Sequence, residues 1–119
     1  MEVRKIRKLL EHGRGLKEGI FTPEELRYCS GQKEPCISLA ALFAVKEAVF
    51  KALGTGLSGD MDWREVGVER GISGTPLLRL CGKTANIARE LGVTRHALSF
   101  SQTKEYGIAV VLLVASPTQ

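Results

Sequence analysis

The sequence has 119 residues, enough to bury one hydrophobic core and too few for two domains, so a single domain over residues 1–119 is expected. Apolar residues make up 44% of the chain and charged residues 25%, as in ordinary globular proteins, and no segment approaches the roughly twenty apolar residues of a membrane helix. The charged N-terminal residues also argue against a signal peptide. The sequence therefore predicts a cytoplasmic protein with no membrane partner.

The net charge of +4 suits an acidic protein or a polyanionic small molecule at least as well as nucleic acid. Aromatic residues are only 6% of the chain and do not alternate with basic ones, so nucleic acid is not expected as a partner. Cys29, Cys36 and Cys81 are odd in number and lack the short spacing of metal ligands. We interpret them as reduced, partly buried thiols and expect no zinc site.

The first predicted helix covers residues 2–13, where apolar residues at helical spacing alternate with basic ones. A basic face of this kind is usually a solvated surface. Three glycines between residues 13 and 19 then indicate a loop. Thr22 and Pro23 predict the start of a second helix that runs to about Cys29, because threonine can cap it and Glu25 can close a capping box.

A long central helix is predicted from about Pro35 to Leu53, with apolar residues recurring at steps of three and four as burial against a sheet requires. The positions expected to be buried are Ala40, Phe43, Ala44, Ala48 and Ala52, widened by Val45, Val49 and Leu53.

Glu47 and Lys51 lie one turn apart on this helix, with Lys46 beside them. Such a pair usually forms only a solvated ion pair. The loop that follows favours a ligand site over a solvated ion pair, because Gly54 and Gly56 flank Thr55 and allow backbone amides to approach a ligand closely. A carboxylate that can hold a divalent cation, a lysine one turn along and a glycine loop together favour a phosphorylated ligand.

The rest of the chain predicts an α+β domain, an antiparallel sheet packed on the long central helix. A hairpin is expected across residues 71–74, a short turn at Asp62 and Trp63 ahead of it, and a helix from Gly82 to Leu91. Trp63 is interpreted as a core or interface anchor. Strands are predicted at residues 95–101 and 106–114, and the near-continuous apolar run of the second suits a central strand.

Four segments of the sequence resemble one family, in the family's order. They are Phe43-x-x-Lys46-Glu47-Ala48-x-x-Lys51-Ala52-x-Gly54-Thr55-Gly56, the stretch from Phe21 to Cys29, Gly74-Thr75-Pro76 with Leu80-x-Gly82, and Ser99 to Thr103. The family is that of the holo-acyl-carrier-protein synthases, the small 4'-phosphopantetheinyl transferases. The resemblance covers most of the chain, from about Arg4 to Val114.

This resemblance implies transfer of 4'-phosphopantetheine from coenzyme A to a serine of an acyl carrier protein, of fatty acid biosynthesis or another pathway, with magnesium and commonly in a homotrimer. Glu47 would then hold magnesium and act with Lys51 in catalysis, and Lys46 and Lys51 would contact the diphosphate. Coenzyme A would lie against Gly54, Thr55, Gly56, Ser101, Gln102 and Thr103. The basic first helix, through Arg4, Arg7 and Arg14, would receive the acidic carrier protein.

The sequence departs from the family pattern at three places. The aspartate that shares magnesium with the helix glutamate falls just ahead of Met1 in the alignment, and Glu2 would point to the opposite face of a strand. Gln102 stands where many members have histidine and cannot act as a base near neutral pH. Leu42 replaces an arginine that could contact phosphate. A second hypothesis follows, a catalytically impaired homologue that binds coenzyme A or a carrier protein.

Overall fold

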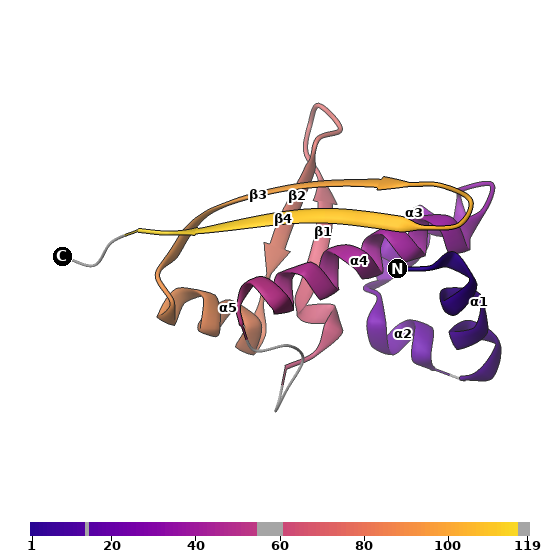
Figure 1. Cartoon of the computed structure of the whole chain (residues 1–119), viewed down its shortest axis with the longest axis horizontal. Coiled ribbons are helices and arrows are strands. Elements are labelled where there is room, and N and C mark those ends of the chain that lie inside the picture. The colour runs from indigo at the N-terminus through magenta and orange to yellow at the C-terminus, as the bar shows by residue number, and fades with distance from the viewer. Residues whose placement is uncertain (14, 55–60, 117–119) are drawn as a thin grey trace.

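The longest helix, α4 (Pro35–Ala52), is the centre of the fold in a computed structural model that describes residues 1–13, 15–54 and 61–116. Figure 1 shows β3 (Val93–Gln102) and β4 (Gly107–Ala115) running along α4, and the hairpin of β1 (Val66–Arg70) and β2 (Pro76–Leu80) crossing their direction. The helices α1 (Val3–His12), α2 (Leu16–Ile20) and α3 (Pro23–Ser30) gather near the N-terminal end of α4. A 3₁₀ helix η1 (Trp63–Glu65) precedes β1, and α5 (Gly82–Glu90) follows β2. The predicted α+β architecture is confirmed.

The helices begin and end largely where local sequence signals place them. Thr22 caps α3 by accepting a hydrogen bond from the Glu25 amide (3.2 Å), while the Glu25 carboxylate accepts one from the Thr22 amide (2.9 Å). Gly54 and Gly92 follow α4 and α5 with φ of 79° and 80°, a left-handed conformation that favours glycine. The short helix α2 was not predicted, because the glycines around it indicated a loop.

The buried face of α4 differs from the one predicted by its alanine spacing. Ala44 and Ala48 are only half-buried and Ala52 is exposed, so that part of the prediction was wrong. The other predicted positions are buried, namely Ala40, Phe43, Val45, Val49 and Leu53, and the interior also receives Ser38, Leu39, Ala41, Leu42, Lys46 and Phe50. In the C-terminal half of the helix the larger Val45, Val49 and Phe50 are buried in preference to alanine, because each removes more apolar surface from water.

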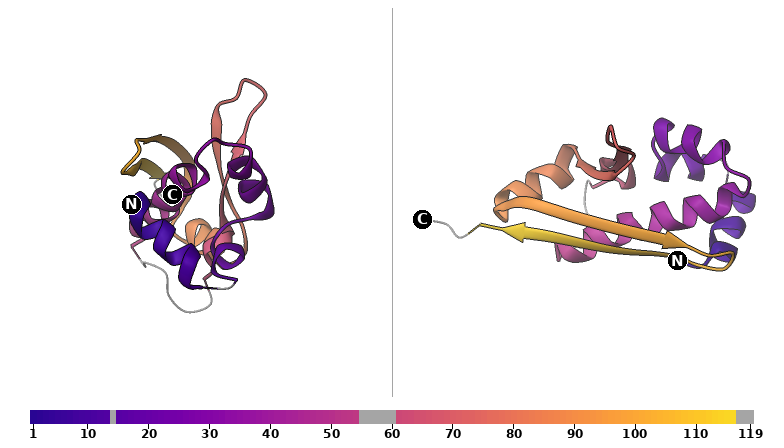
Figure 2. Two further views of the ribbon diagram at one scale, coloured as in Figure 1. Left: turned by 90° about the vertical axis from the view of Figure 1, so that its right-hand side faces the viewer. Right: turned by 90° about the horizontal axis from the view of Figure 1, so that it is seen from above.

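The two hairpins form separate two-stranded antiparallel sheets, and the left view of Figure 2 shows α4 between them. β4 is therefore not a central strand of a larger sheet, contrary to the prediction. Its residues alternate instead: Ala109, Val111 and Leu113 pack against the core, whereas Ile108, Val110 and Leu112 are 57%, 67% and 59% exposed. The continuous apolar run thus provides one buried face and one exposed apolar face.

Two hydrophobic clusters form the core. The first joins α1, α2 and α3 to the N-terminal half of α4, and the second joins its C-terminal half to β1, β2 and α5. Trp63 packs against both clusters, with its ring 4.8 Å from that of Phe43 and 5.4 Å from that of Phe50 between centroids. The prediction that Trp63 anchors the core is confirmed.

The start of the chain lies in an extended conformation beside β4. Met1 exchanges hydrogen bonds with Gly107, and Glu2 forms an isolated antiparallel bridge with Tyr106. The Glu2 carboxylate lies 3.7 Å from the guanidinium of Arg4. At Gly107 β4 presses so closely on α4 that an added Cβ atom would lie 2.3 Å from the amide nitrogen of Ala41.

Candidate functional site

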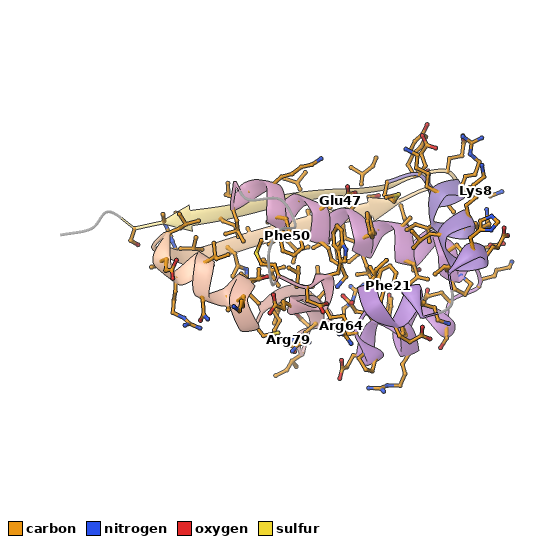
Figure 3. The ribbon with its side chains drawn as sticks, turned by 90° about the horizontal axis from the view of Figure 1, so that it is seen from below. Lys8, Phe21, Glu47, Phe50, Arg64 and Arg79 are labelled. Carbon is orange, nitrogen blue, oxygen red and sulfur yellow. The ribbon has the colours of Figure 1, made fainter. Side chains whose placement is uncertain are left out.

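Glu47 and Lys51 occupy a face of α4 that is open to solvent. Glu47 is half-buried and Lys51 is exposed, and Figure 3 shows Glu47 at the edge of the helix. Among the residues that the structure describes, neither side chain has an ion-pair or hydrogen-bonding partner, so the expected surface ion pair between them is not formed. A carboxylate and an ammonium are thus displayed one turn apart and unpaired, an arrangement that can accept a cation and an anion together.

Lys46, by contrast, lies in the interior with no exposed side-chain surface. Its ammonium is 2.9 Å from Oε1 of Glu25 and donates hydrogen bonds to the carbonyl oxygens of Trp63 (3.2 Å) and Val66. Burial lowers the pKa of Lys46, and the charge of Glu25 opposes that effect. Because an ammonium has three donors and each has a partner here, Lys46 has none left for a diphosphate. We therefore correct the sequence-based assignment and regard Lys46 as a structural residue.

The other predicted ligand residues that the structure describes lie far apart along α4. Gly54 is exposed just beyond the helix, and Thr55 and Gly56 lie outside the described residues. Ser101 and Gln102 end β3, where Gln102 pairs with Gly107 beside Ala40 and Ala41 of α4. The Thr103 hydroxyl accepts hydrogen bonds from the amides of Glu105 (3.2 Å) and Tyr106 (3.0 Å), so it closes the turn between β3 and β4.

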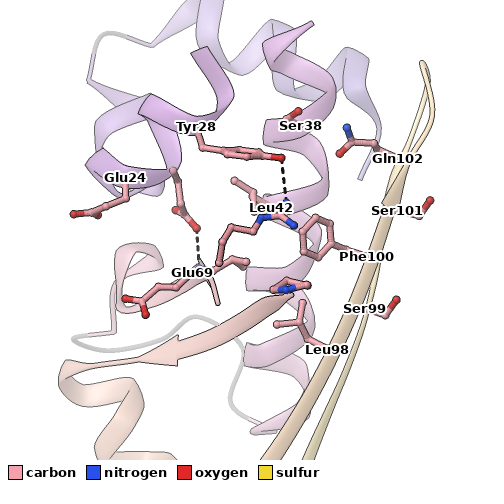
Figure 4. Close-up of a pocket in the computed structure, with 14 residues that line it drawn as sticks. Glu24, Tyr28, Ser38, Leu42, Glu69, Leu98, Ser99, Phe100, Ser101 and Gln102 are labelled. Atoms are coloured by element: carbon pink, nitrogen blue, oxygen red, sulfur yellow. Dashed lines mark hydrogen bonds between the residues drawn. The ribbon is translucent and has the colours of Figure 1, made fainter. Parts of the chain in front are cut away.

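A pocket of about 800 Å³ opens among α3, α4, β1 and β3. Figure 4 shows Tyr28, Leu42 and Phe100 along its walls, with Gln102 directed toward Ser38. Pro76 and Arg70 contribute the wall from the β1–β2 hairpin. Sequence reasoning gave no role to Arg70, although the alternation of β1 places it on the same face as the inward Val66 and Val68.

The pocket and the Glu47–Lys51 face are on different sides of α4. Ser38 and Leu42 line the pocket, and Glu47 follows Leu42 by five residues, which is about 140° around a helix. Gly54 is also about 20 Å farther along the helix than Ala41, which lies beside the end of β3, at 1.5 Å per residue. One chain therefore does not bring Ser101 and Gln102 together with Lys51 and Gly54.

The basic helix α1 is amphipathic as predicted. Val3 and Ile6 are buried, whereas the Arg4 side chain is 77% exposed and the Arg7 side chain is 49% exposed and 3.3 Å from Glu34. Arg14 lies outside the described residues. The described part of this surface is available to an acidic partner, with Lys8 projecting at the end of the molecule in Figure 3.

Glu47 is the residue in this region whose chemistry suits a divalent cation. Its carboxylate is half-buried and has no described partner, although the described residues hold no group of three or more side chains of the metal-ligating kinds. Magnesium keeps several water ligands and takes oxygen from phosphates, so one carboxylate together with a diphosphate fits its requirements. Glu47 is thus suited to serve as one ligand rather than to form a complete protein site.

Comparison with known proteins identifies the family. A sequence model of the 4'-phosphopantetheinyl transferase superfamily matches residues 1–111. This chain belongs to that superfamily. A holo-[acyl-carrier-protein] synthase of Moorella thermoacetica is 38% identical over 116 residues, covering 98% of this chain and 90% of the relative. One of Koribacter versatilis is 43% identical over 94 residues, covering 79% of this chain and 75% of the relative.

Solved structures of the superfamily share the fold. Holo-[acyl-carrier-protein] synthase from Neisseria meningitidis matches 96% of this chain and 92% of its own with a TM-score of 0.83 and 30% identity. The Bacillus anthracis protein, solved in complex with CoA (3',5'-ADP), matches 98% of this chain and 91% of its own with a TM-score of 0.76 and 29% identity. None of the described helices has the length and apolar character that crossing a membrane requires.

Proposed function

We propose that this protein transfers 4'-phosphopantetheine from coenzyme A to a serine of an apo acyl carrier protein. Relatives named holo-[acyl-carrier-protein] synthase over nearly the whole chain support this reaction, as does a related structure solved with CoA (3',5'-ADP). The observation that carries the proposal is the display of Glu47 and Lys51, unpaired among the described residues, on the open side of the helix that bears the family signature.

In the proposed reaction the serine oxygen attacks the phosphorus next to the pantetheine, and the bond from that phosphorus to the oxygen of the second phosphate breaks. Adenosine 3',5'-bisphosphate leaves. Glu47 takes the serine proton, directly or through a water molecule. Lys51 donates to the diphosphate and offsets the negative charge that grows on the leaving group, because a positioned cation contributes most where charge develops.

Glu47 would also hold the magnesium ion, which when bound neutralises charge on the diphosphate. Glu47→Gln tests this role, since it keeps the size of the side chain and removes its negative charge. We expect the variant to keep the wild-type melting temperature and to lose both transfer and any dependence of coenzyme A binding on magnesium. Glu90→Gln, on the exposed surface of α5, is the matched control. Magnesium-dependent binding that survives in Glu47→Gln would contradict the assignment.

A site shared between two chains would explain why the pocket and the Glu47–Lys51 face lie on different sides of α4. The pocket of one chain would hold part of coenzyme A while Glu47 and Lys51 of a neighbouring chain act on the diphosphate, as a homotrimer permits. The exposed apolar face of β4, formed by Ile108, Val110 and Leu112, supports burial between copies, because this much apolar surface is costly to leave in water. Sedimentation equilibrium should give the mass of three chains; a single-chain mass at micromolar concentration would contradict the trimer.

The acyl carrier protein would dock on α1 through Arg4, Arg7 and Arg14. Replacing both Arg4 and Arg7 by glutamine should raise the KM for the carrier protein and leave the KM for coenzyme A unchanged, since exposed charges mainly steer a charged partner. An equal rise of both constants would instead indicate a general defect.

The decisive test is the mass of a carrier protein. Incubating apo acyl carrier protein with this protein, coenzyme A and magnesium should add the mass of phosphopantetheine to it. The absence of any addition at high protein concentration would refute the transfer. Calorimetry that then detects coenzyme A binding indifferent to magnesium would favour the second hypothesis, a binding protein without catalytic activity.

A further inference from the structure

Arg70 is the basic residue among the described residues that line the pocket. It is the last residue of β1, and its backbone pairs with Pro76 of β2. The side chain projects from the face of the strand that carries Val66 and Val68 toward the core, so it enters the pocket from the hairpin side. This places a permanent positive charge beside a recess lined by both apolar and polar side chains.

Two aromatic rings hold the guanidinium in position. Its central carbon lies 5.0 Å from the centroid of the Tyr28 ring and 5.5 Å from that of Phe100. One terminal nitrogen donates to the Tyr28 hydroxyl (3.2 Å; dashed in Figure 4) and the other to the Gly74 carbonyl (3.3 Å). A guanidinium has five donors, so three remain for a ligand. The group is therefore oriented without being neutralised.

The acidic residues near the pocket do not cancel this charge. Glu25 is paired with Lys46 at 2.9 Å, Glu69 with Arg79 at 2.8 Å and Glu24 with Arg27 at 3.8 Å. Figure 4 shows the carboxylates of Glu24 and Glu69 turned away from Phe100 and Gln102. A ligand that enters between Phe100 and Leu42 thus meets Arg70 as its charged contact.

We propose that Arg70 binds the 3'-phosphate of the adenosine of coenzyme A and sets the preference of this protein for nucleotides that carry it. The inference rests on the proposed function. A planar guanidinium with free donors matches the oxygens of a terminal phosphate, and the apolar walls suit a nucleoside. The proposed function assigns the diphosphate of coenzyme A to Glu47 and Lys51, so the phosphate of coenzyme A that remains for this pocket is the 3'-phosphate.

The test compares two nucleotides that differ only in the 3'-phosphate. Calorimetry of the intact protein with adenosine 3',5'-bisphosphate and with adenosine 5'-phosphate should show a preference for the bisphosphate. Arg70→Gln should lower the affinity for the bisphosphate by roughly tenfold to a hundredfold, because a charge-assisted contact is lost, and leave the affinity for the monophosphate unchanged. Arg70→Lys should recover part of the preference. The KM values for coenzyme A and 3'-dephospho-coenzyme A should follow the same pattern.

Arg89→Gln is the matched control, since Arg89 is an exposed arginine on α5 that does not line the pocket. It should bind both nucleotides like the wild type. If Arg70→Gln kept the wild-type preference for the bisphosphate, the proposal would be overturned. An equal loss of affinity for both nucleotides would also overturn it, because Arg70 would then contact the 5'-phosphate that they share. Transfer with unchanged discrimination would refute this inference alone. Discrimination that depends on Arg70 in a protein that transfers nothing would refute the proposed function alone.

Discussion

Lys46 and Lys51 lie on the same helix, five residues apart, yet one is buried and the other is exposed to solvent. Lys46 faces inward to a carboxylate and two carbonyl oxygens, with the ring of Phe21 5.8 Å away. Lys51 faces outward beside Glu47 and has no partner among the described residues. Both lysines stand in the stretch that resembles the family signature, and of the two, Lys51 is the one exposed to solvent. The contacts of Lys46 join α4 to α3, η1 and β1, so we expect this lysine to hold the helix in place rather than to contact a substrate.

The largest expected effect is on the stability of the protein when the buried Lys46 is replaced. Lys46→Ala leaves the Glu25 carboxylate buried with its charge uncompensated, so the free energy of unfolding should fall by about 3–5 kcal/mol in urea titrations. Replacing both residues, Lys46→Met with Glu25→Leu, should cost less than Lys46→Ala because no buried charge remains. A stability within about 1 kcal/mol of the wild type for Lys46→Ala would show that the pair contributes little.

Lys51→Ala should reverse this pattern. Removing a charged contact from a partly desolvated site should cost about 2–3 kcal/mol in coenzyme A affinity or in turnover. The free energy of unfolding should change by under about 1 kcal/mol, since the side chain is exposed and has no described partner. If Lys51→Ala bound coenzyme A and turned over like the wild type, Lys51 would not be part of the site. The two lysines would then differ only in burial.

Local signals in the sequence were sufficient for much of the fold. The limits of α4, the capping box of Thr22 and Glu25 and the β1–β2 hairpin depend on neighbouring residues, and all were predictable. The burial of Lys46 was not, because its acceptors at Glu25, Trp63 and Val66 come from distant parts of the chain. Nothing local marks a lysine for such a network.

The candidate site could be predicted only in part for the same reason. Glu47 and Lys51 are neighbours on one helix, so their common face followed from spacing alone. The pocket draws its walls from four elements, and Arg70 enters it only because β1 crosses near α3. β4 was placed wrongly at the centre of a sheet, because a strand with one exposed apolar face and a strand buried on both faces have the same apolar pattern.

Glu65 holds the segment that contacts Lys46, and its carboxylate makes the stability of the protein depend on pH. Its carboxylate accepts hydrogen bonds from the amides of Asp62 (3.1 Å) and Lys83 (2.9 Å) and from the Thr84 hydroxyl (2.8 Å). It thereby ties η1, which supplies the Trp63 carbonyl to Lys46, to the start of α5. Burial acts to raise the pKa of Glu65, but these hydrogen bonds outweigh it and hold the pKa below the usual 4.5.

A carboxyl whose pKa is lower in the folded state stabilises the protein above pH 4.5 and loses that contribution as the pH falls through the folded value. Glu65→Gln should therefore unfold about 1–2 kcal/mol more easily than the wild type near neutral pH, because an acceptor and its charge are lost. The difference should shrink in acid. A difference of the same size at every pH would assign the effect to packing and not to ionisation.

The smallest expected effect tests whether the contacts around Lys46 influence the exposed face of α4 that carries Glu47 and Lys51. Thr22→Ala removes the hydroxyl that accepts the Glu25 amide at 3.2 Å, which should cost about 1 kcal/mol of stability as lost helix caps do. Glu25 would still accept from Lys46 and from the Val68 amide (3.3 Å), so α4 should keep its position. We expect coenzyme A affinity to stay within twofold of the wild type and Thr22→Ser to restore stability. A larger loss of affinity in Thr22→Ala, reversed in Thr22→Ser, would mean that the cap of α3 sets the orientation of Glu47 and Lys51 across the helix, and the two sides of α4 would then act as one unit.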